Sequence, residues 1–175
     1  MGKREILVFG IIAIVIGIDQ WSKVWAVNNL MGEPSASYLN DFFRITFARN
    51  TGAFLSLGSG LSEDWRYWAL TILPIIVLLY LLYQTLFSKT MSQWQIIAFS
   101  GILGGGLSNI YDRVMYGSVV DFLNMGIGDL RTGIFNVADM AIMGGLFMML
   151  PLMFKRSPKK EADVPAKQQD EDTPI

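Results

Sequence analysis

The sequence lacks histidine and cysteine altogether, and several classes of functional site depend on those two side chains. Their absence excludes Ser-His-Asp and Cys-His catalysis, disulfide bonds, and zinc or haem centres held by imidazole or thiolate. Any chemistry must therefore use carboxylates, Lys, Arg, Ser, Thr, Tyr or backbone groups. We expect no metal and no cofactor.

Charge is also scarce, since 17% of the 175 residues are charged and 52% are hydrophobic. Ten of the charged residues lie in the segment 155–175, whose composition is too polar to bury a core. The net charge of -1, with no basic patch among aromatics, gives no reason to expect nucleic acid as a partner. The composition predicts a membrane domain over 1–154 and a disordered, charged cytoplasmic tail over 155–175.

Four stretches reach the roughly 20 apolar residues that are needed to cross the core of a bilayer. They cover about residues 6–27, 68–87, 94–115 and 134–154. We do not expect the first to be a cleaved signal peptide, because no small-x-small cleavage motif follows Ile18. The sequence predicts an all-α, multi-pass membrane protein with four transmembrane helices.

Basic residues beside these stretches predict the orientation of the chain. Arg4 precedes the first span, Lys89 lies between the second and third, and Lys155 begins a basic group after the fourth. With four spans these groups share one side, which the positive-inside rule assigns to the cytoplasm. Both termini are then cytoplasmic, and residues 28–67 and 116–133 face outward.

The first outward segment carries a strand pattern. From Phe43 to Ala48, aromatic and aliphatic residues alternate with Arg, Thr and Ala, which is the period of two typical of a half-buried strand. We predict a small β-rich segment over about residues 37–58 that rests on the membrane surface.

Polar residues recur in three of the four spans. Asp19 and Lys23 are four apart, and the pattern Asn-x-x-Asp occurs at 109–112 and again at 136–139, so each pair shares a helix face. Ionisable groups within a bilayer cost several kcal/mol unless they pair or line a wet cavity. The predicted topology places all these residues near the outer ends of their spans, so we expect one polar pocket at that level.

Two carboxylates arriving at that pocket suggest a reaction. Asp121 comes from the second outward segment and Asp139 from the fourth span. Two carboxyl groups close together in a low dielectric cannot both ionise, so one can act as a base towards water while the other acts as an acid. This is the chemistry of aspartic peptidases, which needs no His, Cys or metal.

Simpler roles compete for the individual residues. Asp112 with Arg113 is typical of a helix-end ion pair, and Asp19 with Lys23 of a buried salt bridge. The two amides, Asn109 and Asn136, could serve simply to link helices by hydrogen bonds. Three further features can be explained without any role in a site. Asp121 could be a solvated loop residue, Asp129 could be a solvated residue of a Gly-rich loop, and the run Gly104–Gly106 could be a site of close helix approach.

Two other functions stay open at this point. A Ser-Lys peptidase would use Lys23 as base and a distant serine such as Ser108 as nucleophile. A small proton-coupled exporter would instead titrate Asp19 or Asp139, although the patterned outward segment is not typical of that class.

Five blocks of the sequence, taken together and in this order, resemble bacterial lipoprotein signal peptidase (signal peptidase II, aspartic peptidase family A8). The resemblance covers roughly residues 6–154. The blocks are Asp19-Gln20-Trp21-Ser22-Lys23, Arg49-Asn50-Thr51-Gly52-Ala53-Phe54, Gly105-Gly106-Leu107-Ser108-Asn109-Ile110-Tyr111-Asp112-Arg113, Val119-Val120-Asp121-Phe122 and Phe135-Asn136-Val137-Ala138-Asp139.

The resemblance implies a four-helix membrane endopeptidase with an extracytoplasmic β-cradle in the bacterial inner membrane, inhibited by globomycin. Its partners would be membrane lipid and diacylglyceryl-modified prolipoproteins, which it cuts on the N-terminal side of the modified cysteine. We expect a monomer with the active site near the outer leaflet. By matching motif, Asp121 and Asp139 look like the catalytic dyad. The residues that look like supports of the dyad or the substrate are Asn50, Asn109, Arg113, Asn136, Asp19, Lys23 and Asp112.

The sequence departs from the family pattern at two places within the blocks. The family usually has two alanines before the phenylalanine of the second block. Here a single alanine, Ala53, precedes Phe54, and Leu55 comes next. Gly106 and Ser108 stand where the family more often has Ala and Gly, and we expect these small-for-small changes to matter little.

Overall fold

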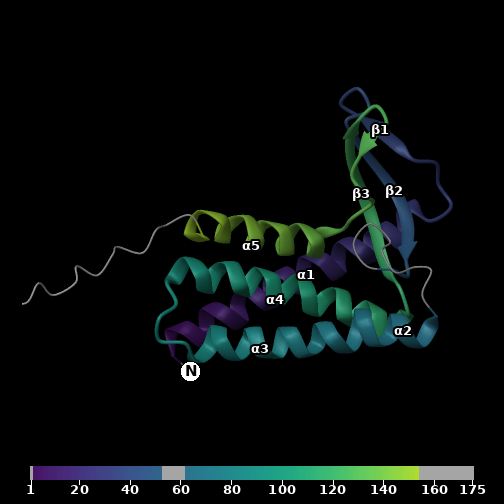
Figure 1. Ribbon diagram of the computed structural model, residues 1–175. Coiled ribbons are helices and arrows are strands. Elements are labelled where there is room, and N and C mark those ends of the chain that lie inside the picture. The colour runs from purple at the N-terminus through teal and green to yellow at the C-terminus, as the bar shows by residue number, and fades with distance from the viewer. Residues whose placement is uncertain (1, 53–61, 154–175) are drawn as a thin grey trace, which may run out of the picture.

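The computed structural model describes residues 2–52 and 62–153, and it consists of a bundle of long helices with a small sheet at one end (Figure 1). The tail predicted over 155–175 and the departure at Ala53–Leu55 lie outside the described residues. The helical elements are α1 (Lys3–Leu30), α2 (Glu63–Tyr67), η2 (Trp68–Ile72), α3 (Leu73–Phe87), α4 (Gln93–Tyr116) and α5 (Val137–Met153). The strands are β1 (Ala36–Tyr38), β2 (Phe43–Asn50), β3 (Val119–Ile127) and β4 (Leu130–Arg131).

All four apolar stretches are helical, although their boundaries differ from the prediction. Among the described residues, two helices are long and apolar enough to cross a membrane, Lys3–Leu30 and Trp68–Phe87, while Val137–Pro151 is apolar but shorter. The second helix begins earlier than expected, at Glu63. It passes through the π-helical turn η2 just before Pro74, whose ring has no N–H to donate and crowds the preceding turn.

Helix α4 packs against α1, α3 and α5, and three consecutive glycines make this close packing possible. A Cβ atom at Gly104 would lie 2.8 Å from the side chain of Val15 in α1. At Gly105 it would lie 2.3 Å from the backbone oxygen of Ala138 in α5, and at Gly106 2.7 Å from Leu78 in α3. The packing role predicted for this run is confirmed, because each glycine admits a different neighbour.

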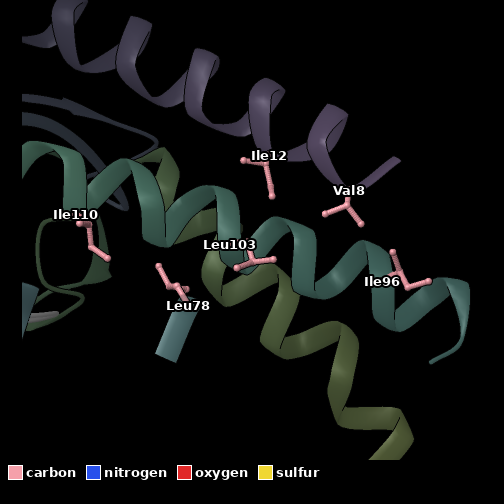
Figure 2. Packing of buried hydrophobic residues seen from close by; sticks show 6 residues of the cluster. All are labelled: Val8, Ile12, Leu78, Ile96, Leu103 and Ile110. Atoms are coloured by element: carbon pink, nitrogen blue, oxygen red, sulfur yellow. The ribbon is translucent and has the colours of Figure 1, made fainter. Parts of the chain in front are cut away.

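Apolar side chains fill the space around α4 farther from the sheet. Val8 and Ile12 of α1 point towards the side of α4 that carries Ile96 and Leu103, and Leu78 of α3 approaches the same helix (Figure 2). Leu103 and Val8 are fully buried. This apolar cluster joins α1, α3 and α4 over the length of α4.

The sheet is antiparallel in the order β1-β2-β3-β4 and extends sideways past the start of α5 (Figure 1). The strand predicted around residues 43–48 is confirmed as β2, which ends at Asn50. One face of β2 and β3 packs on the end of α1, where Ala26 meets Val120 and Phe122. This contact fixes the sheet to the bundle.

The opposite end of the bundle collects the start of α1, the connection between α3 and α4, and the end of α5 (Figure 1). Arg4 joins two of them: its Nε donates to the carbonyl oxygen of Thr85 at 2.6 Å and its Nη1 to that of Ser88 at 2.5 Å. A basic side chain therefore binds the otherwise unpaired carbonyl groups at the C-terminus of α3.

The Gly105→Ala variant should lose stability because its new methyl group meets backbone rather than a flexible side chain, which forces α4 and α5 apart. We expect a loss of about 1–3 kcal/mol, measured as thermal or denaturant unfolding in detergent. Gly101→Ala on the same helix is the control, since its Cβ atom would lie at an ordinary 3.6 Å from Ala141. Equal stability of the two variants would contradict the packing role.

Candidate active site

Asp139 lies in the first turn of α5, where it takes part in the N-terminal cap of the helix. Asn136 precedes the helix, and its side-chain oxygen accepts a hydrogen bond from the backbone N–H of Asp139 at 2.9 Å. In return, the backbone N–H of Asn136 donates to Asp139 Oδ2 at 3.2 Å. This is the reciprocal arrangement of a capping box, with Asn and Asp in place of the usual residues.

The cap corrects one prediction. The spacing 136–139 suggested two residues on the same face of a helix that begins near 134, whereas α5 begins at Val137 and Asn136 lies before it. The same three-residue spacing is that of an N-cap and the third helical residue, so the sequence pattern was real but had a different cause.

Asn136 also connects the two candidate catalytic residues. It is completely buried, and its Nδ2 donates to Asp121 Oδ1 at 2.6 Å. Because its backbone N–H binds Asp139, one asparagine holds both carboxyl groups. Asn109 completes the set by donating to Asp139 Oδ1 at 2.9 Å.

Asp121 lies in β3, which corrects the expectation that it comes from a loop. It is 2% exposed, and each of its two oxygens accepts one amide N–H, from Asn136 and from Asn50 Nδ2 at 2.9 Å. Burial, and to a smaller extent the negative charge of Asp139, raise the pKa of Asp121 to about 6 against the lowering effect of these hydrogen bonds. The carboxyl group therefore exchanges its proton in the neutral range.

A β-bulge places Asn50 beside Asp121. The strands pair Ile45 with Leu123 but Ala48 with Asp121, so β2 carries one extra residue between these pairs. Without the bulge, the pairing of Ile45 with Leu123 would continue in the same register, and Arg49 would lie opposite Val119. The side chain of Asn50 would then lie on the other face of the sheet. With the bulge, Asn50 is opposite Val119 and shares a face with Asp121.

Lys23 is 3% exposed, and its ammonium group has three close partners, two carboxylates and one amide oxygen. The Nζ atom lies 2.6 Å from Asp19 Oδ2, 2.6 Å from Asp112 Oδ2 and 2.8 Å from Asn109 Oδ1. The buried salt bridge predicted between Asp19 and Lys23 is confirmed. Asp112 pairs with Lys23 rather than forming the predicted pair with Arg113.

Asp19 connects this ion pair to the start of α5. It is completely buried, and its Oδ1 accepts the backbone N–H of Ala138 at 2.7 Å. Ala138 precedes Asp139 in the chain, so a residue of α1 fixes the backbone next to a candidate catalytic residue. Hydrogen bonds to charged groups are roughly twice as strong as neutral ones, which favours a rigid link.

The side chain of Arg113, near the end of α4, connects this helix with the residues that follow β2. Its Nη2 donates to the carbonyl oxygen of Gly52 at 3.0 Å and its Nη1 to that of Asn109 at 3.3 Å. Its Nε is buried and has no hydrogen-bond partner within the part of the chain that the structure describes. The guanidinium group therefore keeps a buried N–H without a partner among the described residues, and its charge interacts with both Asp121 and Asp139.

The charges of the site do not balance. Four carboxyl groups (Asp19, Asp112, Asp121 and Asp139) share the site with two cations (Lys23 and Arg113). Since excess like charge in a low dielectric favours proton uptake, one of the carboxyl groups is expected to keep a proton. Asp19 and Asp112 both pair with Lys23, whereas Asp121 and Asp139 form no salt bridge with any described residue, so this pair is the place for that proton.

The structure thus brings together every predicted site residue, and it adds Gln20, which had no predicted role, and Ser108, which was considered only as a nucleophile. Gln20 Nε2 donates to Ser108 Oγ and to Asp112 Oδ1, both at 2.9 Å. Ser108 Oγ donates to Asp19 Oδ2 at 2.7 Å, so this position carries more than the small-for-small change we expected. Gln20 lies within the block that contains Asp19, which was the available signal. Asp129 is exposed in the turn between β3 and β4, as predicted.

These contacts oppose the Ser-Lys alternative. Ser108 is completely buried and its hydroxyl proton is directed to Asp19, while the donors of Lys23 are all engaged by other groups. A nucleophile and its base must lie within hydrogen-bond reach of each other and of the substrate. Neither requirement is met by this pair.

Comparison with known proteins agrees with this geometry. Residues 11–155 match the family model of signal peptidase (SPase) II, Peptidase_A8. The lipoprotein signal peptidase of Psychromonas ingrahamii is 37% identical over 139 residues, which cover 79% of this chain and 79% of that protein. The lipoprotein signal peptidase of Oleidesulfovibrio alaskensis is 30% identical over 155 residues, covering 89% and 99% respectively.

Two solved structures, both described as bacterial membrane enzymes determined by the in meso method, have a similar fold. The one at 2.3 Å resolution superposes with a TM-score of 0.71 at 29% identity, covering 90% of this chain and 93% of that one. The one at 1.9 Å has a TM-score of 0.72, with coverage of 86% and 94%. The chain therefore belongs to the signal peptidase II family, the lipoprotein signal peptidases of bacteria, which are aspartic peptidases of the membrane.

Proposed function

We propose that this protein removes signal peptides from prolipoproteins by cutting on the N-terminal side of a diacylglyceryl-modified cysteine, with Asp121 and Asp139 as the catalytic dyad. The observation that carries the proposal is the sharing of Asn136 by the two carboxyl groups. Membership of a peptidase family favours this enzyme over the exporter.

The reaction uses one carboxyl group in each protonation state. The ionised carboxylate takes a proton from water as the water oxygen bonds to the scissile carbonyl carbon, and the protonated group donates to the carbonyl oxygen. Collapse of the tetrahedral intermediate breaks the C–N bond, and the amine leaves with a proton from the dyad. The pKa of about 6 at Asp121 supports this exchange near neutral pH. The pair titrates as a unit, so neither residue is assigned the proton alone.

The remaining site residues support the dyad. Asn50, Asn109 and Asn136 donate to the carboxylate oxygens and fix their orientation. Arg113 is close enough to interact electrostatically with both aspartates, and its positive charge suits the stabilisation of a developing oxyanion. Asp19, Lys23 and Asp112 hold the helices that carry these groups.

A neighbouring cavity supports a lipid-modified substrate. It has a volume of about 280 Å³ and lies beside Asp139, between the sheet and the outward face of α5. Its other walls are apolar side chains and one threonine. They are Met125, Thr132, Phe135, Met140, Met143 and Phe147. Such a surface suits an acyl chain that is held next to the scissile bond.

We infer four membrane spans, formed by α1, the helix from η2 to α3, α4 and α5, with both termini cytoplasmic and the sheet outside the inner membrane. The grouping of Arg4 with the α3–α4 connection at the end opposite the sheet supports this topology. It puts the dyad near the outer leaflet, where the lipid of the substrate lies. We also propose that the protein acts as a monomer.

Replacing either dyad residue should abolish cleavage without preventing folding. Asp121→Asn and Asp139→Asn remove the proton exchange, so we expect roughly 10²–10⁴-fold lower turnover of a lipid-modified precursor by purified enzyme, and uncut precursor in cells. Asp129→Asn, in the exposed turn, is the matched control and should be fully active. Normal processing by either dyad variant would contradict the proposed mechanism.

The Asn50→Ala variant should shift the pH dependence of cleavage in a defined direction. The N–H of Asn50 favours the ionised form of Asp121 and so lowers its pKa, and its loss must raise that pKa above about 6. Whichever limb of the kcat/KM profile Asp121 controls should move to higher pH. The measurement is kcat/KM of purified enzyme from acid to alkaline pH. A shift to lower pH, or none, would refute the role of Asn50.

The natural lack of cysteine allows a direct test of topology. Asp129→Cys lies in the β3–β4 turn and Thr90→Cys between α3 and α4, and both positions are exposed. In intact cells, a membrane-impermeant maleimide should label only the first, because the second faces the cytoplasm. Permeabilised cells, in which both should react, are the control. Labelling of Thr90→Cys in intact cells would overturn the four-span arrangement.

A further inference from the structure

We propose that Ser108 and Gln20 are positioning residues for the catalytic dyad, acting through the buried ion cluster of Asp19, Lys23 and Asp112. This inference rests on the proposed role of Asp139. Neither residue contacts Asp121 or Asp139 in any hydrogen bond of the described chain, so any effect on the reaction must pass through other groups.

The direction of every hydrogen bond in this chain of contacts is fixed by chemistry. An amide nitrogen such as Gln20 Nε2 only donates, and an ionised carboxylate only accepts. Ser108 Oγ, which lies 2.9 Å from that nitrogen, must therefore accept from it and direct its own proton to Asp19 Oδ2 at 2.7 Å. The second N–H of Gln20 goes to Asp112 Oδ1 at 2.9 Å.

These contacts hold two carboxylates that would otherwise repel each other. Asp19 and Asp112 share a single ammonium group, so the ion cluster carries an excess negative charge, and the side chains are 0% and 4% exposed. Gln20 and Ser108 supply the additional donors that water would provide at the surface. Their geometry sets where each carboxylate lies around Lys23.

Two routes lead from the ion cluster to Asp139. In the first, Asp19 Oδ1 binds the backbone N–H of Ala138 at 2.7 Å, directly before Asp139. In the second, Lys23 Nζ binds Asn109 Oδ1 at 2.8 Å, and Asn109 Nδ2 binds Asp139 Oδ1 at 2.9 Å. A displacement of Asp19 or Lys23 is therefore transmitted to both the backbone and the carboxyl group of Asp139.

The test compares Ser108→Ala with Ser100→Ala in cleavage of a lipid-modified precursor by purified enzyme. Both serines are 0% exposed and lie on α4, but Ser100 donates only to the backbone oxygen of Ile96 in its own helix. We expect Ser108→Ala to lower kcat roughly tenfold or more with KM unchanged, because small displacements of catalytic groups are costly, and Ser100→Ala to match the wild type.

Gln20→Met keeps the length of the side chain and removes both donors, and it serves as a second, independent variant. It should also lower kcat alone, and the double variant with Ser108→Ala should lose little more than the worse single one, because both break the same chain. Equal kcat for Ser108→Ala and Ser100→Ala, multiplying losses in the double variant, or a loss confined to KM would overturn the inference. An inactive wild-type enzyme would instead overturn the proposed function.

Discussion

Lys23 carries a buried ammonium group whose three donors meet Asp19, Asp112 and Asn109, and the polar half of the molecule is arranged around this one cation. A buried charge is tolerated only when it is paired and fully hydrogen-bonded. Because the partners come from α1 and α4, and Asp19 reaches on to α5, this requirement fixes three helices at the level of the site. The packing along Gly104–Gly106 lets the same helices approach closely enough to satisfy it.

The hydrogen bonds around the start of α5 hold the two aspartates of the proposed dyad. Asn136 ends the strand-to-helix connection as the N-cap of α5, and the same residue binds both Asp121 and Asp139. A structural requirement of every helix, the capping of its first N–H groups, here also sets the orientation of the two proposed catalytic groups. The bulge in β2 adds Asn50 from the other side. Hydrogen bonds from both sides therefore hold Asp121 in place.

Much of this was predictable from the sequence because the physical signals are local. Runs of apolar residues predict the helices, and alternation of apolar and polar residues predicts β2. The free-energy cost of burying charge predicts that Asp19, Lys23 and Asn109 lie together. The strand β3 was not predictable in the same way, since its first four residues are all buried and so do not alternate. The bulge, the start of α5 and the contact of Gln20 with Ser108 depend on pairing between distant segments, which a pattern along one chain does not contain.

The central claim is that the dyad activates water directly, with no covalent bond between enzyme and substrate. The most direct measurement is cleavage of a lipid-modified precursor by the purified protein in the presence of hydroxylamine, followed by mass analysis of the released signal peptide. Direct attack by water predicts only the free carboxylic acid, whereas an acyl-enzyme would transfer part of the peptide to the stronger nucleophile. A hydroxamate product would contradict the account.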